Sequence, residues 1–126
     1  MQKVEIEKIV QARIEDAEVL YDASRFDGSV YLCGYAVELG LKARICRTLQ
    51  WDEYPTSGKY NTFKTHDLDV LLHLTGLEDK VKLKYMAAWS IVAQWNPEAR
   101  YNPIGNVNNS DAKDMLDSTK ELLEQL

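Results

Sequence analysis

Hydrophobic residues recur every three or four positions along most of the chain, and polar residues fill the positions between them. This spacing is typical of amphipathic helices, which pack one face against a core. It predicts helices over 3–24, 30–49, 66–74, 78–95 and 110–126. No segment shows the alternation of a β-strand. We therefore expect an all-α fold, an up-and-down bundle of four longer helices and one short helix, in a single domain spanning 1–126.

The segment 30–49 differs from the others because it is apolar on nearly every side. A helix of that kind is surrounded by neighbours, so we expect it at the centre of the bundle. Small residues such as Gly34 and Gly40 would let those neighbours approach closely. The preceding Asp27-Gly28-Ser29 predicts a turn and a helix cap.

Turn-forming residues divide the remaining helices. The hydrophobic pattern fails over 51–65, which predicts a surface loop long enough to have a role. Thr65 can cap the short helix that follows, and Gly76 can end it. Ser110 can cap the last helix after a second loop, 102–109, which is rich in Pro, Gly and Asn.

Composition narrows the class of protein. The chain has 126 residues, of which 45% are hydrophobic and 28% charged, and its net charge is −5. These values fit one soluble globular domain. The negative net charge does not favour binding of long nucleic acid by the domain as a whole, although it is compatible with a local basic patch. With no signal peptide and no apolar run long enough for a bilayer, we expect a cytoplasmic protein without membrane contact. Cys33 and Cys46 are interpreted as buried thiols of a reducing compartment.

Glu38 is the first residue that could carry chemistry. A carboxylate within an apolar helix must be paired, hydrogen-bonded or protonated. Lys42, one helical turn later, is the obvious partner. The simpler interpretation is an ordinary Glu–Lys helix pair worth a few tenths of a kcal/mol.

Arg100 is the second candidate. It follows the helix stop at Pro97 and lies between Trp95 and Tyr101. Its planar fork suits a phosphate or a carboxylate. The structural alternative is an arginine bonded to Glu38, to helix-end carbonyls or to the aromatic rings.

The two histidines do not predict a metal site. His66 and His73 lie seven residues apart on one predicted helix, too far apart to bind one metal ion together. His66 fits a supporting role at the helix start, and Asp67 and Asp69 fit the first turn, where negative charge is favourable. Since no glycine-rich phosphate loop is present either, we predict no cofactor.

Three segments together resemble the HEPN domain, named for higher eukaryote and prokaryote nucleotide-binding proteins. They are Tyr31 to Ala43, Thr65-His66-Asp67-Leu68 and Trp95-Asn96-Pro97-Glu98-Ala99-Arg100-Tyr101. The resemblance implies a helical bundle that pairs with a second copy. Its cleft would be lined by the central helix and by the segment after 78–95.

The resemblance also shows a departure that affects function. Many HEPN domains are metal-independent ribonucleases in which about four to six residues separate the arginine from a following histidine. Arg100 matches the arginine, but Gly105, Asn106 and Val107 stand where the histidine should fall. Glycine or an amide cannot exchange a proton near neutral pH as imidazole can, and losing a general acid or base typically costs about a hundred- to ten-thousand-fold in rate.

The leading hypothesis is therefore a dimeric, non-catalytic HEPN domain. As the resemblance implies for such members, it would bind a nucleotide, an RNA or a minimal nucleotidyltransferase partner in a toxin–antitoxin-like system. The expected cleft residues, followed by supporting ones, are Arg100, Tyr101, Glu38, Lys42 and Trp95, then His66, Asp67 and Asn106. One alternative is a ribonuclease toxin whose base is displaced to His66 or His73. The other is a pure interaction or scaffold module.

Overall fold

The computed structural model describes all residues, 1–126, and it contains helices without a β-sheet, as predicted. The helices are α1 (Lys3–Asp22), α2 (Phe26–Leu49), η1 (Gly58–Phe63), α3 (Leu68–Thr75), α4 (Glu78–Lys84), α5 (Met86–Val92), η2 (Pro97–Tyr101) and α6 (Asn109–Gln125). The two η elements are short 3₁₀ helices. The all-α prediction is confirmed.

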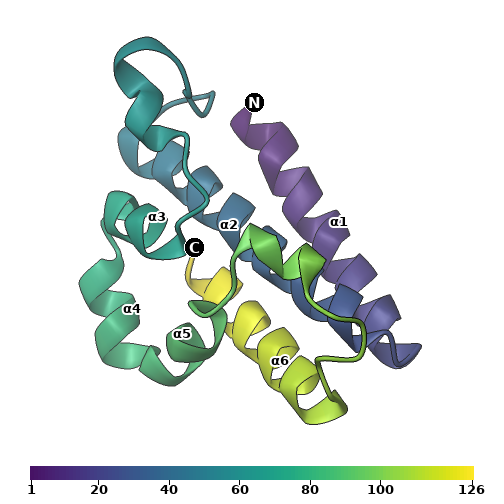
Figure 1. The fold of residues 1–126 in the computed structure, drawn as a ribbon. Coiled ribbons are helices and arrows are strands. Elements are labelled where there is room, and N and C mark those ends of the chain that lie inside the picture. Colours follow the sequence, from purple (N-terminus) through teal and green to yellow (C-terminus); the bar gives the residue numbers. More distant parts are fainter.

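The helix α2 forms the centre of the molecule. It runs antiparallel to α1, and it also packs against α3, α6 and η2 (Figure 1). Half of its 24 residues are buried, compared with three of the 20 residues of α1 and six of the 17 residues of α6. The central position expected from its apolar composition is therefore correct.

The start of α2 differs from the prediction, because the helix begins at Phe26 rather than Val30. The chain reverses direction earlier, at Ser24, which adopts a left-handed backbone with a φ of 60°. Gly28 therefore lies within the helix, where a Cβ would come within 3.2 Å of Leu20. The lack of a side chain at Gly28 lets α1 pack closely against α2. The expected turn and cap at Asp27-Gly28-Ser29 is wrong.

The predicted helix 78–95 is divided in two. Tyr85, with φ −127° and ψ 30°, interrupts the helical backbone between α4 and α5, and α5 ends at Val92. No proline or glycine lies at the break. The bend lets Trp89 and its buried neighbours pack against α6. Tertiary packing therefore determines where the helix breaks. The bundle accordingly has three long helices and three short ones.

Two helix caps also differ from those predicted. Asp67, not Thr65, is the N-cap of α3, because its carboxylate accepts the backbone N–H groups of Asp69 and Val70. Thr65 instead accepts the N–H of Asp67. At the other end, Gly76 ends α3 with a φ of 79°, as predicted.

The last helix is capped by Asn108 instead of Ser110. The Asn108 side chain accepts the N–H of Asp111 at 2.8 Å, and Ser110 lies inside the first turn. An amide oxygen two residues earlier satisfies the free donors of the helix start equally well.

The predicted surface loop 51–65 has an internal core of its own. Trp51, Tyr54, Tyr60 and Phe63 pack edge to face, with ring centroids 5.3–6.1 Å apart. The Tyr54 hydroxyl also donates to the Phe63 carbonyl at 2.5 Å. These contacts hold the segment that leads to His66. No helix combines the length and apolar character needed to cross a bilayer.

Candidate functional site

Trp95 holds the segment after α5 against the central helix. Its buried indole lies on Gly34 of α2, where a Cβ would fall 2.1 Å from the ring atom Cδ2. The ring of Tyr31, one turn earlier on α2, lies 6.0 Å away at a tilt of 45°. The glycine thus creates the space for Trp95, and Trp95 determines where η2 begins.

The short helix η2 presents Arg100 to solvent. Asn96 caps η2 by accepting the N–H of Glu98 at 2.9 Å. The guanidinium of Arg100 lies 4.9 Å from the centroid of the Tyr101 ring, which is itself 70% exposed. The phenol groups of Tyr101 and Tyr31 raise the pKa of Arg100 further above its ordinary value, so the side chain stays charged.

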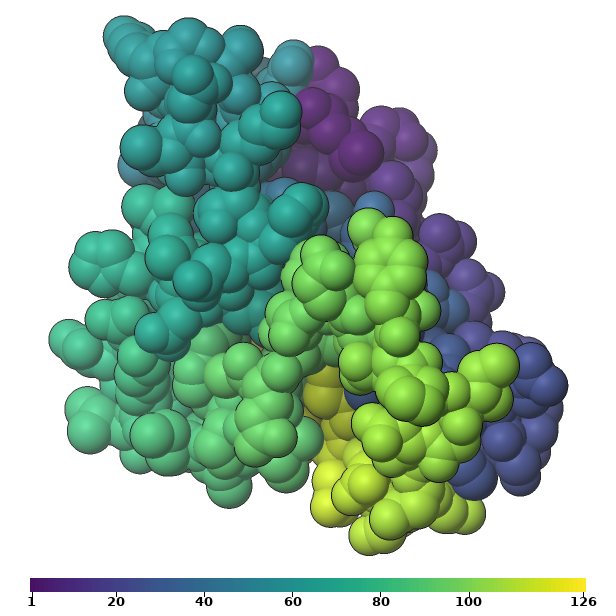
Figure 2. All heavy atoms as spheres, in the orientation of Figure 1, coloured from purple at the N-terminus to yellow at the C-terminus, as the bar shows by residue number.

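Arg100 has no acidic partner. No carboxylate oxygen lies within 4.0 Å of it, so the ion pair with Glu38 that would have made it a structural residue is absent. The groups that favour its charge are the side chains of Tyr101 and Tyr31. Figure 2 shows η2 and the loop after it, in light green, standing out on the face in view. Arg100 is therefore available to an anion.

Glu38 belongs to a second polar cluster on α2. Its carboxylate is only 2% exposed, and it accepts a bond from Lys42 Nζ at 3.2 Å. His66 Nδ1 lies 3.0 and 3.1 Å from the two carboxylate oxygens. Lys42 also lies over the Tyr54 ring, 5.4 Å from its centroid. The Glu–Lys pair is thus present, but it is extended by an imidazole that comes from a different segment.

His66 occupies a position that the sequence did not indicate. It precedes α3 instead of lying in it, so it does not share a helical face with His73. Its ring is 66% exposed, while Nδ1 faces the buried carboxylate. Nε2 is therefore the nitrogen left to exchange protons or to meet a ligand. His73, at 3.5 Å from Glu78, belongs to a surface ion-pair group.

The two clusters lie along one face of α2. Tyr31, beside Arg100, and Glu38, beside His66, are seven residues apart, which is two helical turns. At a rise of 1.5 Å per residue they are separated by about 10 Å along the helix axis. Arg100 of η2 and His66 of the segment before α3 thus lie beside the same face of α2, about two turns apart.

Asp67 and Asn106 were expected to support the site. Asp67 is committed to capping α3, so its role is structural. Asn106 is exposed, in a loop whose position is determined by Asp27: the Asp27 carboxylate accepts the N–H groups of Gly105 at 2.6 Å and Val107 at 3.1 Å. These two bonds enclose Asn106 and fix its place relative to η2.

Sequence reasoning did not place Tyr31 or Asp27 at the site, and it expected close packing at Gly34 without identifying Trp95 as the partner. Tyr31, Gly34 and Asp27 position Arg100, Trp95 and the loop around Asn106, respectively. Gly34 carried the clearest signal, since a glycine within a long apolar helix often marks a close approach. No three His, Cys, Asp or Glu side chains come together in a group that could hold a metal ion.

Fold and site together define a helical bundle in which an exposed arginine lies beside the central helix. The family model of the HEPN domain matches residues 8–126, and the chain therefore belongs to the HEPN domain family. This family is known for nucleotide and RNA binding and for ribonuclease activity. Comparison with curated proteins and with solved structures gave no match.

Proposed function

We propose that this protein is a non-catalytic HEPN domain that binds a nucleotide or a short RNA on the face of α2 covered by η2. The observation that carries the proposal is Arg100, an exposed guanidinium with no acidic partner, stacked on an exposed tyrosine. A planar guanidinium binds a phosphate through two parallel hydrogen bonds, and an exposed aromatic ring can stack on a base.

The residues around Arg100 favour binding over cleavage. Asn106 lies between Gly105 and Val107, the two loop residues whose N–H groups bind Asp27. Its side-chain amide has no titrating proton near neutral pH. Glu38 is buried, and both of its oxygens already have partners, so it cannot act directly on a ligand. Its part is to hold Lys42 and His66 in place beside the face.

The direct test is titration of fluorescent nucleotides and short single-stranded RNAs with purified protein. We expect Arg100→Ala to weaken binding at least about tenfold and Arg100→Lys to restore only part of it, since an ammonium lacks the bidentate fork. Arg13→Ala removes the same charge from α1 and should leave binding unchanged.

The same variants separate binding from a scaffold role. Because Arg100 is exposed and unpaired, its replacement should leave the melting temperature near that of the wild type. A large fall in melting temperature without loss of ligand would mean that Arg100 holds the bundle together. Equal binding by wild type and Arg100→Ala would refute the proposed site.

We also propose that the protein works as a homodimer in the cytoplasm, and that its partner is a minimal nucleotidyltransferase in a toxin–antitoxin-like pair. The support is the family's tendency to dimerise, combined with an exposed arginine face that lacks a catalytic histidine. Co-expression with the candidate partner and tandem purification would test it. Failure of Arg100→Ala to alter the complex would place the partner elsewhere on the surface.

A second candidate is ribonuclease activity with His66 as the base. The pairing of His66 with buried Glu38 favours it, because a carboxylate behind Nδ1 orients an imidazole for proton transfer through Nε2. Against it stands the separation of about 10 Å along α2, since the base and the phosphate ligand must act within about 3 Å of adjacent atoms.

Cleavage of a mixed RNA pool in EDTA distinguishes the two candidates. We expect no cleavage by the wild type, and a gain of cleavage in Asn106→His, which would restore an arginine–histidine pair in the loop held by Asp27. Cleavage by the wild type that disappears in both Arg100→Ala and His66→Ala would instead establish the second candidate.

A further inference from the structure

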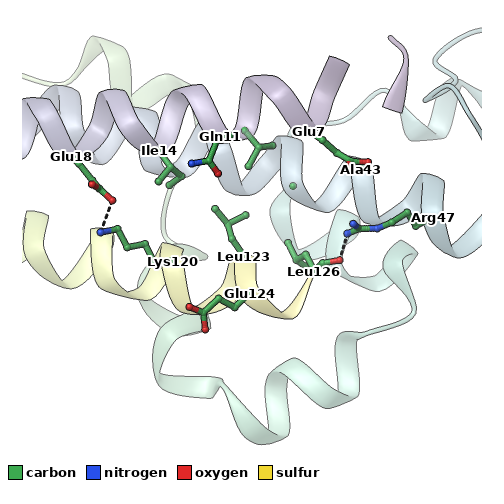
Figure 3. A pocket seen from close by; sticks show the side chains of 12 residues that line it. Glu7, Gln11, Ile14, Glu18, Ala43, Arg47, Lys120, Leu123, Glu124 and Leu126 are labelled. Carbon is green, nitrogen blue, oxygen red and sulfur yellow. Dashed lines mark hydrogen bonds and ion pairs between the residues drawn. The ribbon is translucent and has the colours of Figure 1, made fainter. Parts of the chain in front are cut away.

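A groove separate from the Arg100 face runs between α1 and α6, with α2 as its floor (Figure 3). Its volume is about 510 Å³, which is within the range of ligand and peptide sites. The apolar side chains that line it are Val10, Ile14, Ala43, Leu123 and Leu126. In Figure 3, Ile14 points into the groove from α1 and Leu123 from α6.

The groove arises from the way in which the two helices pack. Both α1 and α6 lie along α2, but they contact each other much less than they contact α2. Gly40 of α2 lets Leu123 approach so closely that a Cβ there would lie 2.6 Å from it. An opening therefore remains between α1 and α6 above α2.

Polar contacts engage the two cations of the groove, one at each end. Lys120 Nζ lies 2.5 Å from Glu18 Oε1 at one end. At the other end Arg47 donates to the Leu126 carbonyl oxygen. Glu7 on α1 and Glu124 on α6 line the opening, and neither has a cationic partner within 4.0 Å. The opening therefore combines apolar walls with two unpaired carboxylates, while Arg47, at one end, is hydrogen-bonded to a carbonyl oxygen and has no acidic partner.

We propose that this groove binds an amphipathic helix of another protein, whose apolar stripe enters the groove and whose Lys or Arg residues face Glu7 and Glu124. Apolar grooves commonly accept helices in this way, through residues spaced three and four apart. Glu7 and Glu18 are eleven residues apart on α1, so the groove is about 16 Å long and accommodates roughly three helical turns.

Charge decides against a second copy of this chain as the occupant. Two copies that met groove to groove would bring Glu7 and Glu124 of one close to those of the other, in a protein whose net charge is already −5. Like charges facing each other across an interface are costly and suppress such pairings. A basic helix meets no such penalty.

The test is fluorescence anisotropy with the full chain and a designed peptide of about 14 residues, which carries leucines at three- and four-residue spacing with lysines on both flanks. A matched peptide with glutamates in place of the lysines is the control. We expect saturable binding of the lysine peptide, with a gain of peptide helicity by circular dichroism, and at least tenfold weaker binding of the glutamate peptide.

Variants of the protein then locate the binding. Glu7→Lys/Glu124→Lys should weaken binding of the lysine peptide at least tenfold, and Leu123→Gln should weaken it without a change in net charge. Asp22→Lys/Asp79→Lys is the matched control, because it changes the net charge equally at exposed positions outside the groove.

Three outcomes would overturn the proposal. One is lack of binding at peptide concentrations of about 1 mM. Another is an equal loss of binding in the groove and control variants, which would indicate general attraction to an acidic surface. The third is a change of the protein's own oligomeric state in Glu7→Lys/Glu124→Lys or Leu123→Gln, which would make a second copy the occupant.

Discussion

At the scale of single residues, Glu38 has the most constrained environment. A buried carboxylate is tolerated only where hydrogen bonds or an ion pair replace its lost hydration. Lys42 and His66 supply these contacts from two directions. Lys42 is mostly buried, whereas His66 is largely exposed to water that screens its charge, so Lys42 should contribute more to stability.

Replacing Lys42 by alanine should lower the free energy of unfolding by about 2–3 kcal/mol, because Glu38 would keep its burial and lose its fixed charge partner. Urea denaturation measures the change. Lys113→Ala removes an exposed partner at the same i,i+4 spacing and should cost less than about 0.5 kcal/mol. Equal effects of the two variants would mean that the buried pair adds nothing beyond a surface pair.

The buried thiol of Cys33 should make the free energy of unfolding fall at alkaline pH. Burial raises the pKa of its thiol to about 12, from an ordinary value of 9.0. The folded state therefore favours the protonated thiol, and this contribution is fully present below about pH 9. It is lost between about pH 9 and 12, at up to about 1.4 kcal/mol per pH unit.

Urea denaturation between pH 8 and 10.5 should show this loss, and the slope against pH should be smaller in Cys33→Ala, whatever that variant's absolute stability. In native protein at pH 8, Cys33 should also resist thiol reagents until the chain is unfolded. A slope unchanged by Cys33→Ala would assign the alkaline sensitivity to other groups.

At the scale of elements, η2 and the loop after it depend on contacts with α2. Trp95 lies on Gly34 at the start of η2, and Asp27 binds the loop at Gly105 and Val107. Arg100 lies between these two attachments. The position of the arginine is therefore set by α2, although η2 carries it.

Gly34→Ala tests this dependence. The added Cβ would lie 2.1–2.3 Å from three ring atoms of Trp95, so the ring must leave its place and η2 must move with it. Overpacking of this kind costs about 1–3 kcal/mol, more than the roughly 1 kcal/mol that alanine gains over glycine in a helix. We expect lower stability together with weaker nucleotide binding.

Gly28→Ala is the matched control on the same helix. Its Cβ would meet only Leu20 Cδ1, at 3.2 Å, and a small side-chain shift relieves that contact. Unfolding and binding titrations of both variants make the comparison. Normal nucleotide binding by a destabilised Gly34→Ala would show that Arg100 does not depend on Trp95.

At the scale of the whole molecule, the surface around Arg100 carries exposed apolar groups. Ile104 is 99% exposed and Tyr101 is 70% exposed, and both lie in the segment after α5. Two such side chains in one segment give the proposed second copy an apolar surface to cover. We therefore propose that the second copy pairs along this segment.

Light scattering after gel filtration should therefore give twice the chain mass of 14.5 kDa. Ile104→Asp should shift the protein toward the monomer while the circular dichroism stays unchanged, because Ile104 makes little contact within its own chain. Leu83→Asp, at another exposed apolar residue on α4, is the control. A monomeric wild type would contradict the proposed dimer.

The sequence by itself determined the features that depend on near neighbours. Helical periodicity identified the all-α fold and the central helix, Gly76 marked a helix end, and the four-residue spacing identified the pair of Glu38 and Lys42. Such features follow from backbone geometry and from side chains within one or two turns, so a pattern in the sequence reveals them.

Only the tertiary structure decided which distant segments meet. His66 reaches Glu38 across 28 residues, and Asp27 binds Gly105 across 78. The helix break at Tyr85 and the contact of Trp95 with Gly34 likewise depend on packing against other helices. No local pattern encodes these contacts, because each requires the whole bundle to bring its two partners together.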